Sequence, residues 1–243
     1  MPEKIKRQLP IIILIGVCII CVGLLLLPTK EVQKEKTKTE EIAKQEGKEE
    51  VEEPQIDLGQ PDIIKQYQTE YNNPDIVAEL EIPNTDIKTP IPRGTDNDFY
   101  LDHLPDKQES YLGSIFLDYR NTPDDRKIII YGHNSPNIDT IFHGLEQYTN
   151  SDYYQTHQDI YLQTANQRYR YKIFSVYIAT SNVSHVNLNL TNPEYTRHLQ
   201  WIKEQSLYDT GISINNEDII ILQTCYYNPQ NSYLIIAGKK VNN

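Results

Sequence analysis

The hydrophobic residues of this chain fall into short runs separated by polar turns, and two of these runs share one form. Residues 219–222 are all Ile or Leu, and a polar step after them leads to Cys225. Residues 127–133 contain a similar run and end on His133. Uninterrupted aliphatic runs of this length are typical of strands buried on both faces. The pattern therefore predicts two buried strands, each of which delivers one member of a cysteine–histidine pair at its carboxyl end.

The remaining pattern predicts a mainly β fold. Further strands are predicted at residues 76–82, 86–91, 114–119, 160–162, 168–179 and 233–241. Helices are predicted from apolar positions at helical spacing at residues 62–71, 136–148 and 192–207, the last with Asn192 as its N-cap and Pro193 at N1. About eight strands and three helices, without βαβ alternation, favour a mainly antiparallel barrel that is closed or half-closed.

The amino-terminal region has a different pattern. Residues 11–27 form an uninterrupted apolar run, which is just long enough for a membrane-spanning helix of about 17–25 residues. A cleaved signal peptide is the alternative, but its apolar run would be about 7–15 residues long and a small-residue cleavage site would follow. Residues 28–31, Pro-Thr-Lys-Glu, offer no such site. The pattern therefore favours an uncleaved membrane anchor.

Charges around this run predict its orientation. Basic residues precede it, and the segment after it is net acidic, so the positive-inside rule places the amino terminus in the cytoplasm and the remainder outside the cell. Residues 30–53 are nearly all Lys, Glu, Gln and Thr and are too polar to fold. We therefore predict a single-pass anchor at residues 1–29, a charged stalk at 30–60 and a folded domain at 61–243.

Charge and cysteine usage narrow the possible functions. The 243 residues carry a net charge of −11 and no basic patch, which argues against a nucleic-acid partner. Cys18 and Cys21 lie in the apolar amino-terminal run, so Cys225 has no disulfide partner in the folded region. It is therefore either an inert buried residue or a reactive thiol.

Only one of the six histidines stands at the end of a predicted buried strand, and this is His133. The others are expected at the surface: His103, His143, His157, His185 and His198. The chain has no cysteine cluster and no close pair of histidines, so the sequence predicts no metal site and no cofactor. A functional pair of Cys225 and His133 is the chemical hypothesis that the pattern supports.

Several stretches resemble one enzyme family. Tyr-Gly-His at 131–133, Leu-Gln-Thr-Cys at 222–225 and Leu-Ile-Ile-Ala-Gly at 234–238 are similar to the sortases, the cysteine transpeptidases of Gram-positive cell surfaces. Class B sortases are indicated by further stretches at residues 96–101, 113–121, 133–142 and 201–208. The resemblance covers about residues 62–241 and implies an eight-stranded barrel with an amino-terminal helix and two further helices.

The resemblance also implies a reaction. Cys225 would attack the carbonyl carbon after the Thr of a sorting motif in a surface protein or pilin, where class B motifs look like Asn-Pro-(Gln/Lys)-Thr-(Asn/Gly/Ser). The resulting thioester would pass to an amine of a cell-wall precursor or a pilin lysine. His133 would protonate the leaving amine and then deprotonate the incoming one. Residues implied for the substrate groove are Asn97, Leu101, Tyr131, Gln223 and Thr224.

One position departs from the family. Sortases carry an arginine at the start of the last strand, facing the thiol, and Tyr233 stands there in this chain. Lys239 shares its face but lies six residues on, about 20 Å at roughly 3.3 Å per residue. Three alternatives follow: the enzyme is slow, Tyr233 takes the donor role, or an arginine of another loop, such as Arg120 or Arg93, supplies the donor. In the first and third of these, Tyr233 is simply an aromatic residue of the strand.

Three functions remain possible for the chain. The leading one is a membrane-anchored transpeptidase. A degenerate sortase fold that only binds or scaffolds its partners is the second, and a hydrolytic cysteine peptidase is the third.

Overall fold

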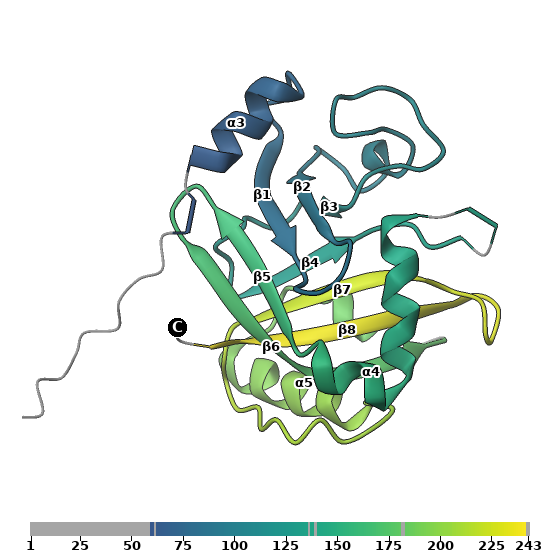
Figure 1. The fold of residues 1–243 in the computed structure, drawn as a ribbon. Coiled ribbons are helices and arrows are strands. Elements are labelled where there is room, and N and C mark those ends of the chain that lie inside the picture. Colours follow the sequence, from purple (N-terminus) through teal and green to yellow (C-terminus); the bar gives the residue numbers. More distant parts are fainter. Residues whose placement is uncertain (1–58, 61, 136, 139, 181–182, 242–243) are drawn as a thin grey trace, which may run out of the picture. The chain divides into compact units, whose positions relative to one another are not determined.

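The computed structural model describes residues 59–60, 62–135, 137–138, 140–180 and 183–241. In this part of the chain, eight strands form one sheet in the order β2-β1-β5-β6-β8-β7-β4-β3. Their bounds are β1 Ile76–Glu81, β2 Lys88–Pro92, β3 Phe116–Leu117, β4 Lys127–Tyr131, β5 Asp159–Thr164, β6 Arg168–Ala179, β7 Ile219–Tyr226 and β8 Ser232–Val241. The sheet curls into a nearly closed barrel (Figure 1). It is not fully closed, because the two edge strands β2 and β3 lie close together without forming a shared ladder. The predicted eight-stranded barrel is confirmed.

Helical segments cover parts of the barrel (Figure 1). They are α3 Asp62–Glu70, η1 Phe99–Leu101, η2 Ile141–Thr149, α4 Ser151–Thr156, η3 Ser184–Val186 and α5 Asn192–Glu204. The helix predicted at 136–148 is a 3₁₀ helix that begins later, at Ile141, and α4 was not predicted. The Asn150 side chain accepts from the backbone N–H of Asp152, so it caps a new helix that begins just beyond the predicted one.

The start of α5 also differs from the prediction by one residue. The cap is Thr191 rather than Asn192, because Glu194 reaches back and accepts from the Thr191 backbone N–H at 2.8 Å in a capping box. Pro193 still lies in the first turn, where its missing N–H costs no helical hydrogen bond.

One pair of strands explains how the predicted cysteine and histidine meet. β4 and β7 run parallel, although the other strand pairs of the sheet are antiparallel. Tyr131 of β4 lies opposite Gln223 of β7. His133 lies two residues beyond Tyr131, and Cys225 lies two residues beyond Gln223. The parallel register therefore brings both residues to one edge of the barrel.

The apolar run of β7 is buried on both faces, as predicted. Ile220 and Leu222 belong to the core inside the barrel, and Ile219 and Ile221 belong to a second core that includes buried residues of α5. Because side chains alternate along a strand, Cys225 shares the outer face of Ile219 and Ile221. The thiol therefore emerges outside the barrel, next to the core that α5 covers.

The predicted anchor at residues 1–29 and nearly all of the predicted stalk at 30–60 lie outside the described residues. Within the described ranges, no helix combines the length and apolar character needed to cross a bilayer. The division into anchor, stalk and folded domain therefore stays a prediction.

Candidate active site

A pocket of about 320 Å³ lies where β4 and β7 end. Phe116 and Gly132 line it together with the residues that the sequence predicted for the thiol site and the substrate groove. These are Asn97, Leu101, Tyr131, His133, Gln223, Thr224, Cys225 and Tyr233. These residues come from η1 and the loop before it, from β3, from β4 and the turn after it, from β7 and from β8. The fold thus gathers segments that are far apart in the sequence around one thiol.

Cys225 is a free, half-buried cysteine in the last part of β7. Burial raises the pKa of its thiol above the ordinary value. The resting residue at neutral pH is therefore mostly the protonated thiol, and attack on a carbonyl requires a nearby group that accepts its proton.

His133 follows directly after the end of β4, and its ring is anchored by the backbone of η1. The Nε2 atom lies 2.6 Å from the carbonyl oxygen of Leu101. A carbonyl oxygen only accepts, so Nε2 carries a proton in this contact. In the neutral imidazole, Nδ1 is then the unprotonated nitrogen that is left to exchange protons.

This anchor depends on a glycine in the neighbouring turn. Gly113 has φ of +59°, a conformation that favours glycine. A Cβ at this position would clash with the carbonyl oxygen of Leu101 and would lie 2.9 Å from the ring of His133. Glycine therefore allows the turn to press against the same carbonyl group that holds the histidine.

Two side chains lock the strand ends around the pair. Thr224 donates its hydroxyl to the carbonyl oxygen of Gly132 at 2.7 Å, in a buried contact. Asn134 donates its amide to the carbonyl oxygen of Cys225 at 3.0 Å. The residue before the thiol is thus tied to β4, and the residue after the histidine is tied to β7. The Thr224 hydroxyl is engaged internally, so its contribution is to shape the site.

Comparisons with known proteins decide the family. The model of the sortase domain matches residues 80–241. The chain is 33% identical over 177 residues to sortase B of Listeria monocytogenes, which covers 70% of this chain and 71% of the relative. This chain belongs to the sortase family. It is a sortase B-like cysteine transpeptidase.

Solved structures agree with this assignment. Sortase B of Clostridium perfringens superposes with a TM-score of 0.68 and 31% identity, covering 73% of this chain and 98% of that one. A substrate complex of sortase B from Staphylococcus aureus shares the fold, with a TM-score of 0.67 and 24% identity over 74% of this chain and 84% of that one.

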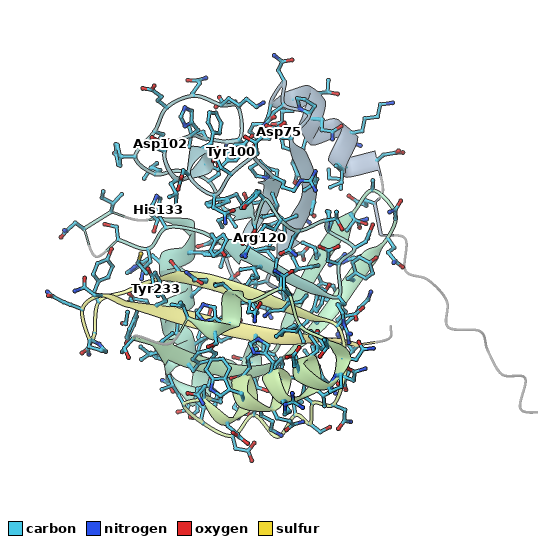
Figure 2. All side chains as sticks on the ribbon, turned by 180° about the vertical axis from the view of Figure 1, so that it is seen from behind. Asp75, Tyr100, Asp102, Arg120, His133 and Tyr233 are labelled. Atoms are coloured by element: carbon cyan, nitrogen blue, oxygen red, sulfur yellow. The ribbon has the colours of Figure 1, made fainter. Side chains whose placement is uncertain are left out.

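The sortase has Tyr233 directly across from Cys225. Cys225 and Tyr233 are paired positions of the antiparallel strands β7 and β8. Paired residues project to the same side, with Cβ atoms about 4.5–5.5 Å apart. Figure 2 shows Tyr233 and His133 near the same edge of the barrel, and both line the pocket. The Tyr233 hydroxyl makes no hydrogen bond to any residue that the structure describes.

The cations considered as substitutes for the family arginine lie elsewhere. Arg120 binds Asp118 through Nε at 2.8 Å and Nη2 at 2.6 Å, and Arg93 donates to the carbonyl oxygen of Asn121 at 2.9 Å. Lys239 pairs with Glu217 at 3.0 Å. None of the three cations lines the pocket. Among the side chains that do line it, Tyr233 is the donor across from the thiol.

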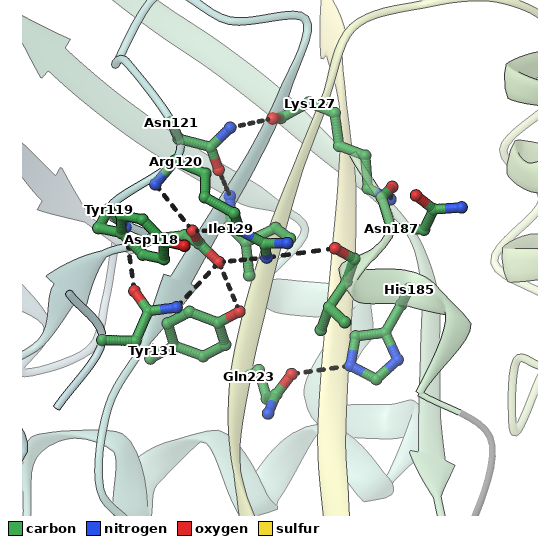
Figure 3. A network of polar contacts seen from close by, with 12 residues as sticks. Asp118, Tyr119, Arg120, Asn121, Lys127, Ile129, Tyr131, His185, Asn187 and Gln223 are labelled. Carbon is green, nitrogen blue, oxygen red and sulfur yellow. Dashed lines mark hydrogen bonds and ion pairs between the residues drawn. The ribbon is translucent and has the colours of Figure 1, made fainter. Parts of the chain in front are cut away.

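Asp118 organises one wall of the pocket (Figure 3). It is fully buried and accepts from Arg120, from the Tyr131 hydroxyl at 2.8 Å and from the Asn97 amide at 3.2 Å. Burial opposes its ionisation, but the hydrogen bonds from Arg120 and Tyr131 hold its pKa below the ordinary value. Asn97 and Tyr131 thus line the pocket with polar groups that are already bound to Asp118.

The expectation that every histidine except His133 lies at the surface is wrong for His185. This residue of η3 is fully buried, and its Nε2 lies 2.7 Å from Oε1 of Gln223 (Figure 3). Its segment has no periodic pattern from which this contact could be predicted. In the described ranges, no cluster of three or more His, Cys, Asp or Glu side chains could hold a metal ion.

Proposed function

We propose that this sortase cleaves the sorting signal of a surface protein or pilin and transfers the acyl portion to an amine. The Cys225 thiolate attacks the carbonyl carbon of the motif threonine, and the C–N bond to the next residue breaks as the thioester forms. An acceptor amine then attacks the thioester, and the thiolate leaves. The single observation that supports this function is that Cys225 and His133 line one pocket at the ends of two parallel strands.

His133 moves the protons in both steps. It takes the proton of the thiol and gives a proton to the leaving amine, and later it accepts the proton of the incoming amine. Nδ1 is suited to this exchange because Nε2 is occupied by the carbonyl oxygen of Leu101. The same anchor fixes the orientation of the ring, which matters because general acid–base catalysis depends on geometry.

Tyr233 supplies the hydrogen bond that stabilises the oxyanion during attack. Support comes from its position across from Cys225, from its place in the pocket lining and from its hydroxyl, which has no partner in the described part of the chain. A phenol gives one neutral hydrogen bond where a guanidinium gives several charged ones. The reaction is therefore expected to be slower than in a sortase with the family arginine.

The sortase acts outside the cell, at the membrane. Residues 11–27 anchor it in a single pass with the amino terminus in the cytoplasm, and the charged stalk carries the catalytic domain away from the bilayer. Protease added to intact cells should remove the carboxyl-terminal domain and leave a small fragment with the amino terminus. A domain that resists protease until the cells are lysed would contradict this orientation.

The function is tested with the full-length protein in detergent and a peptide that contains Asn-Pro-Gln-Thr-Asn. We expect an acyl adduct on Cys225 by mass spectrometry, and a transfer product when an amine such as triglycine or a diamine is added. The Cys225→Ala variant is the control and should give neither product.

Two other outcomes would favour the competing functions. Peptide binding that persists in Cys225→Ala, with no adduct and no turnover in the wild type, would indicate a scaffolding module. Hydrolysis that is the same with and without the amine would indicate a peptidase.

A further inference from the structure

The polar side chains of the pocket differ in whether their donors are already used. Asn97 and Tyr131 donate to Asp118, and the Asn97 carbonyl oxygen accepts from the Tyr119 backbone N–H at 2.9 Å. Gln223 uses only its carbonyl oxygen, in the contact with His185. Its NH₂ group therefore carries two donors that contact no other part of the described chain, at a position that lines the pocket.

His185 fixes which end of the Gln223 amide faces the pocket. Burial lowers the pKa of His185, the hydrogen bond to Gln223 opposes this shift, and the charge of Lys127 adds to it. The ring is therefore neutral and has a single N–H. Since the amide oxygen can only accept, this N–H is on Nε2, and it holds the oxygen of Gln223 away from the pocket.

The opposite orientation of the amide is less favourable. If the NH₂ group pointed at His185, Nε2 would accept and the ring proton would sit on Nδ1. Nδ1 is buried and has no hydrogen-bond partner in the described structure. An orphaned buried N–H is rarer than an orphaned acceptor, so the observed orientation leaves the smaller penalty.

We propose that His185 positions the Gln223 amide so that its NH₂ group donates to the side-chain carbonyl of the substrate residue before the motif threonine, which selects Gln over Lys there. This proposal rests on the proposed function and names the motif that it leaves open. Gln223 precedes Cys225 by two residues on the same face, about 7 Å at roughly 3.3 Å per residue. An extended peptide acylated at Cys225 would place its next residue within reach of that amide.

The selection follows from the number of donors on each side. A glutamine in the peptide offers a carbonyl oxygen to the NH₂ group, whereas a lysine ammonium offers only further donors. One hydrogen bond made or lost corresponds to about 0.5–1.5 kcal/mol, which is roughly a two- to twelvefold difference in binding. Because the contact lies outside the reacting bond, the difference should appear mainly in KM.

The test compares kcat/KM for two peptides that differ only in Asn-Pro-Gln-Thr-Asn against Asn-Pro-Lys-Thr-Asn. The wild-type protein should prefer the glutamine peptide roughly tenfold. Gln223→Glu keeps an oxygen for His185 but replaces the NH₂ group by an acceptor, so it should reverse the preference. A Gln223→Glu variant with the wild-type preference would overturn the proposal.

The role of His185 is tested separately. His185→Phe removes the N–H and frees the amide to rotate, so the preference should fall to roughly threefold or less while kcat is unchanged. His185→Gln restores a donor close to the position of Nε2 and should recover the preference. Thermal unfolding of each variant shows whether it folds, and Gln223→Glu carries the test by itself if His185→Phe does not.

The outcomes separate the two proposals. If no peptide acylates Cys225 in the wild type, the proposed function fails and this inference falls with it. If both peptides acylate Cys225 with equal kcat/KM, the transpeptidase stands and only the selection by Gln223 is refuted.

Discussion

The two sides of the pocket treat their polar groups in opposite ways. On the side of β3 and β4, Asn97 and Tyr131 both donate to the buried carboxylate of Asp118. On the side of β7 and β8, the Tyr233 hydroxyl and the Gln223 NH₂ group contact no other described part of the protein. We call the first side the completed wall, because Asn97 and Tyr131 already have their hydrogen-bond acceptor within the protein. Under the proposed function, the donors of the second side are available to the substrate, and donors aimed at developing charge are the larger source of catalysis.

A matched pair of substitutions gives the largest expected contrast between the two sides. Tyr233→Phe removes the donor across from Cys225, and the loss of one oxyanion donor costs about 10²–10³ in kcat. Tyr131→Phe removes the same hydroxyl from the completed wall, so it should cost roughly 1 kcal/mol of stability and leave kcat nearly unchanged. Steady-state kinetics with the sorting peptide measures both. Equal kcat values for the two variants would remove Tyr233 from the mechanism.

Restoring the family residue sharpens the same contrast. Tyr233→Arg places a charged donor where the sequence departs from other sortases, and kcat should rise above that of the wild type if the phenol is a weaker substitute. A variant that folds but is slower than the wild type would indicate that the pocket is built around the tyrosine.

The completed wall is expected to depend strongly on its carboxylate. Asp118→Ala leaves the guanidinium of Arg120, the hydroxyl of Tyr131 and the amide of Asn97 without their acceptor, so the free energy of unfolding should fall by roughly 3 kcal/mol. Denaturant unfolding measures this change. The control is Asp118→Asn, which keeps the shape and one oxygen and should lose less. An Asp118→Ala protein as stable as the wild type would show that the wall does not need its carboxylate.

The sequence could locate Cys225 and His133 at the pocket but not the wall beside them. The β7 run is apolar on both faces, so its end at Cys225 was visible without a structure, and the same holds for β4 and His133. The parallel pairing that joins them depends on a crossover that residue patterns do not specify. Asp118 joins the wall through Asn97 and Tyr131, 21 and 13 residues away, and His185 contacts Gln223, 38 residues away. The segment η3 also has no period from which burial could be inferred. Local sequence patterns predict which face of an element is buried, whereas polar networks depend on which residues become neighbours in the folded protein.

We expect Lys127, the first residue of β4, to make the stability of the protein depend on pH. Its buried ammonium contacts the carbonyl oxygen of Asn187 and Nε2 of His198, and no carboxylate accepts from it in the described structure. Burial, together with the charge of Arg120, lowers the pKa of Lys127 to about 7. As pH falls from 9 to 7, the unfolded chain binds the proton before the folded one does, so stability is lost on acidification.

The expected size of this effect is about 2 kcal/mol between pH 9 and pH 7. Lys127→Met should remove that part of the pH dependence, whatever its effect on absolute stability. The control is Lys88→Met, which removes the same charge from a largely exposed side chain and should keep the wild-type slope. Urea unfolding at several pH values measures the slopes, and identical slopes for the wild type and Lys127→Met would refute a shifted lysine.

The smallest expected effect concerns the orientation of His133. Substitutions at two glycines distinguish the effect of backbone strain from that of a displaced contact with its ring. Gly113 and Gly211 both have positive φ, +59° and +71°, so alanine at either position costs about 1–2 kcal/mol of backbone strain. A Cβ at Gly113 would meet Leu101 and His133, whereas a Cβ at Gly211 would have no neighbour within 4 Å. Gly113→Ala should therefore lower kcat roughly tenfold by displacing the carbonyl group that orients His133, since a misplaced catalytic group loses rate steeply. Gly211→Ala should lose similar stability and keep its kcat. If the two variants have the same kcat, the contact with Leu101 does not set the position of the His133 imidazole in the proposed reaction.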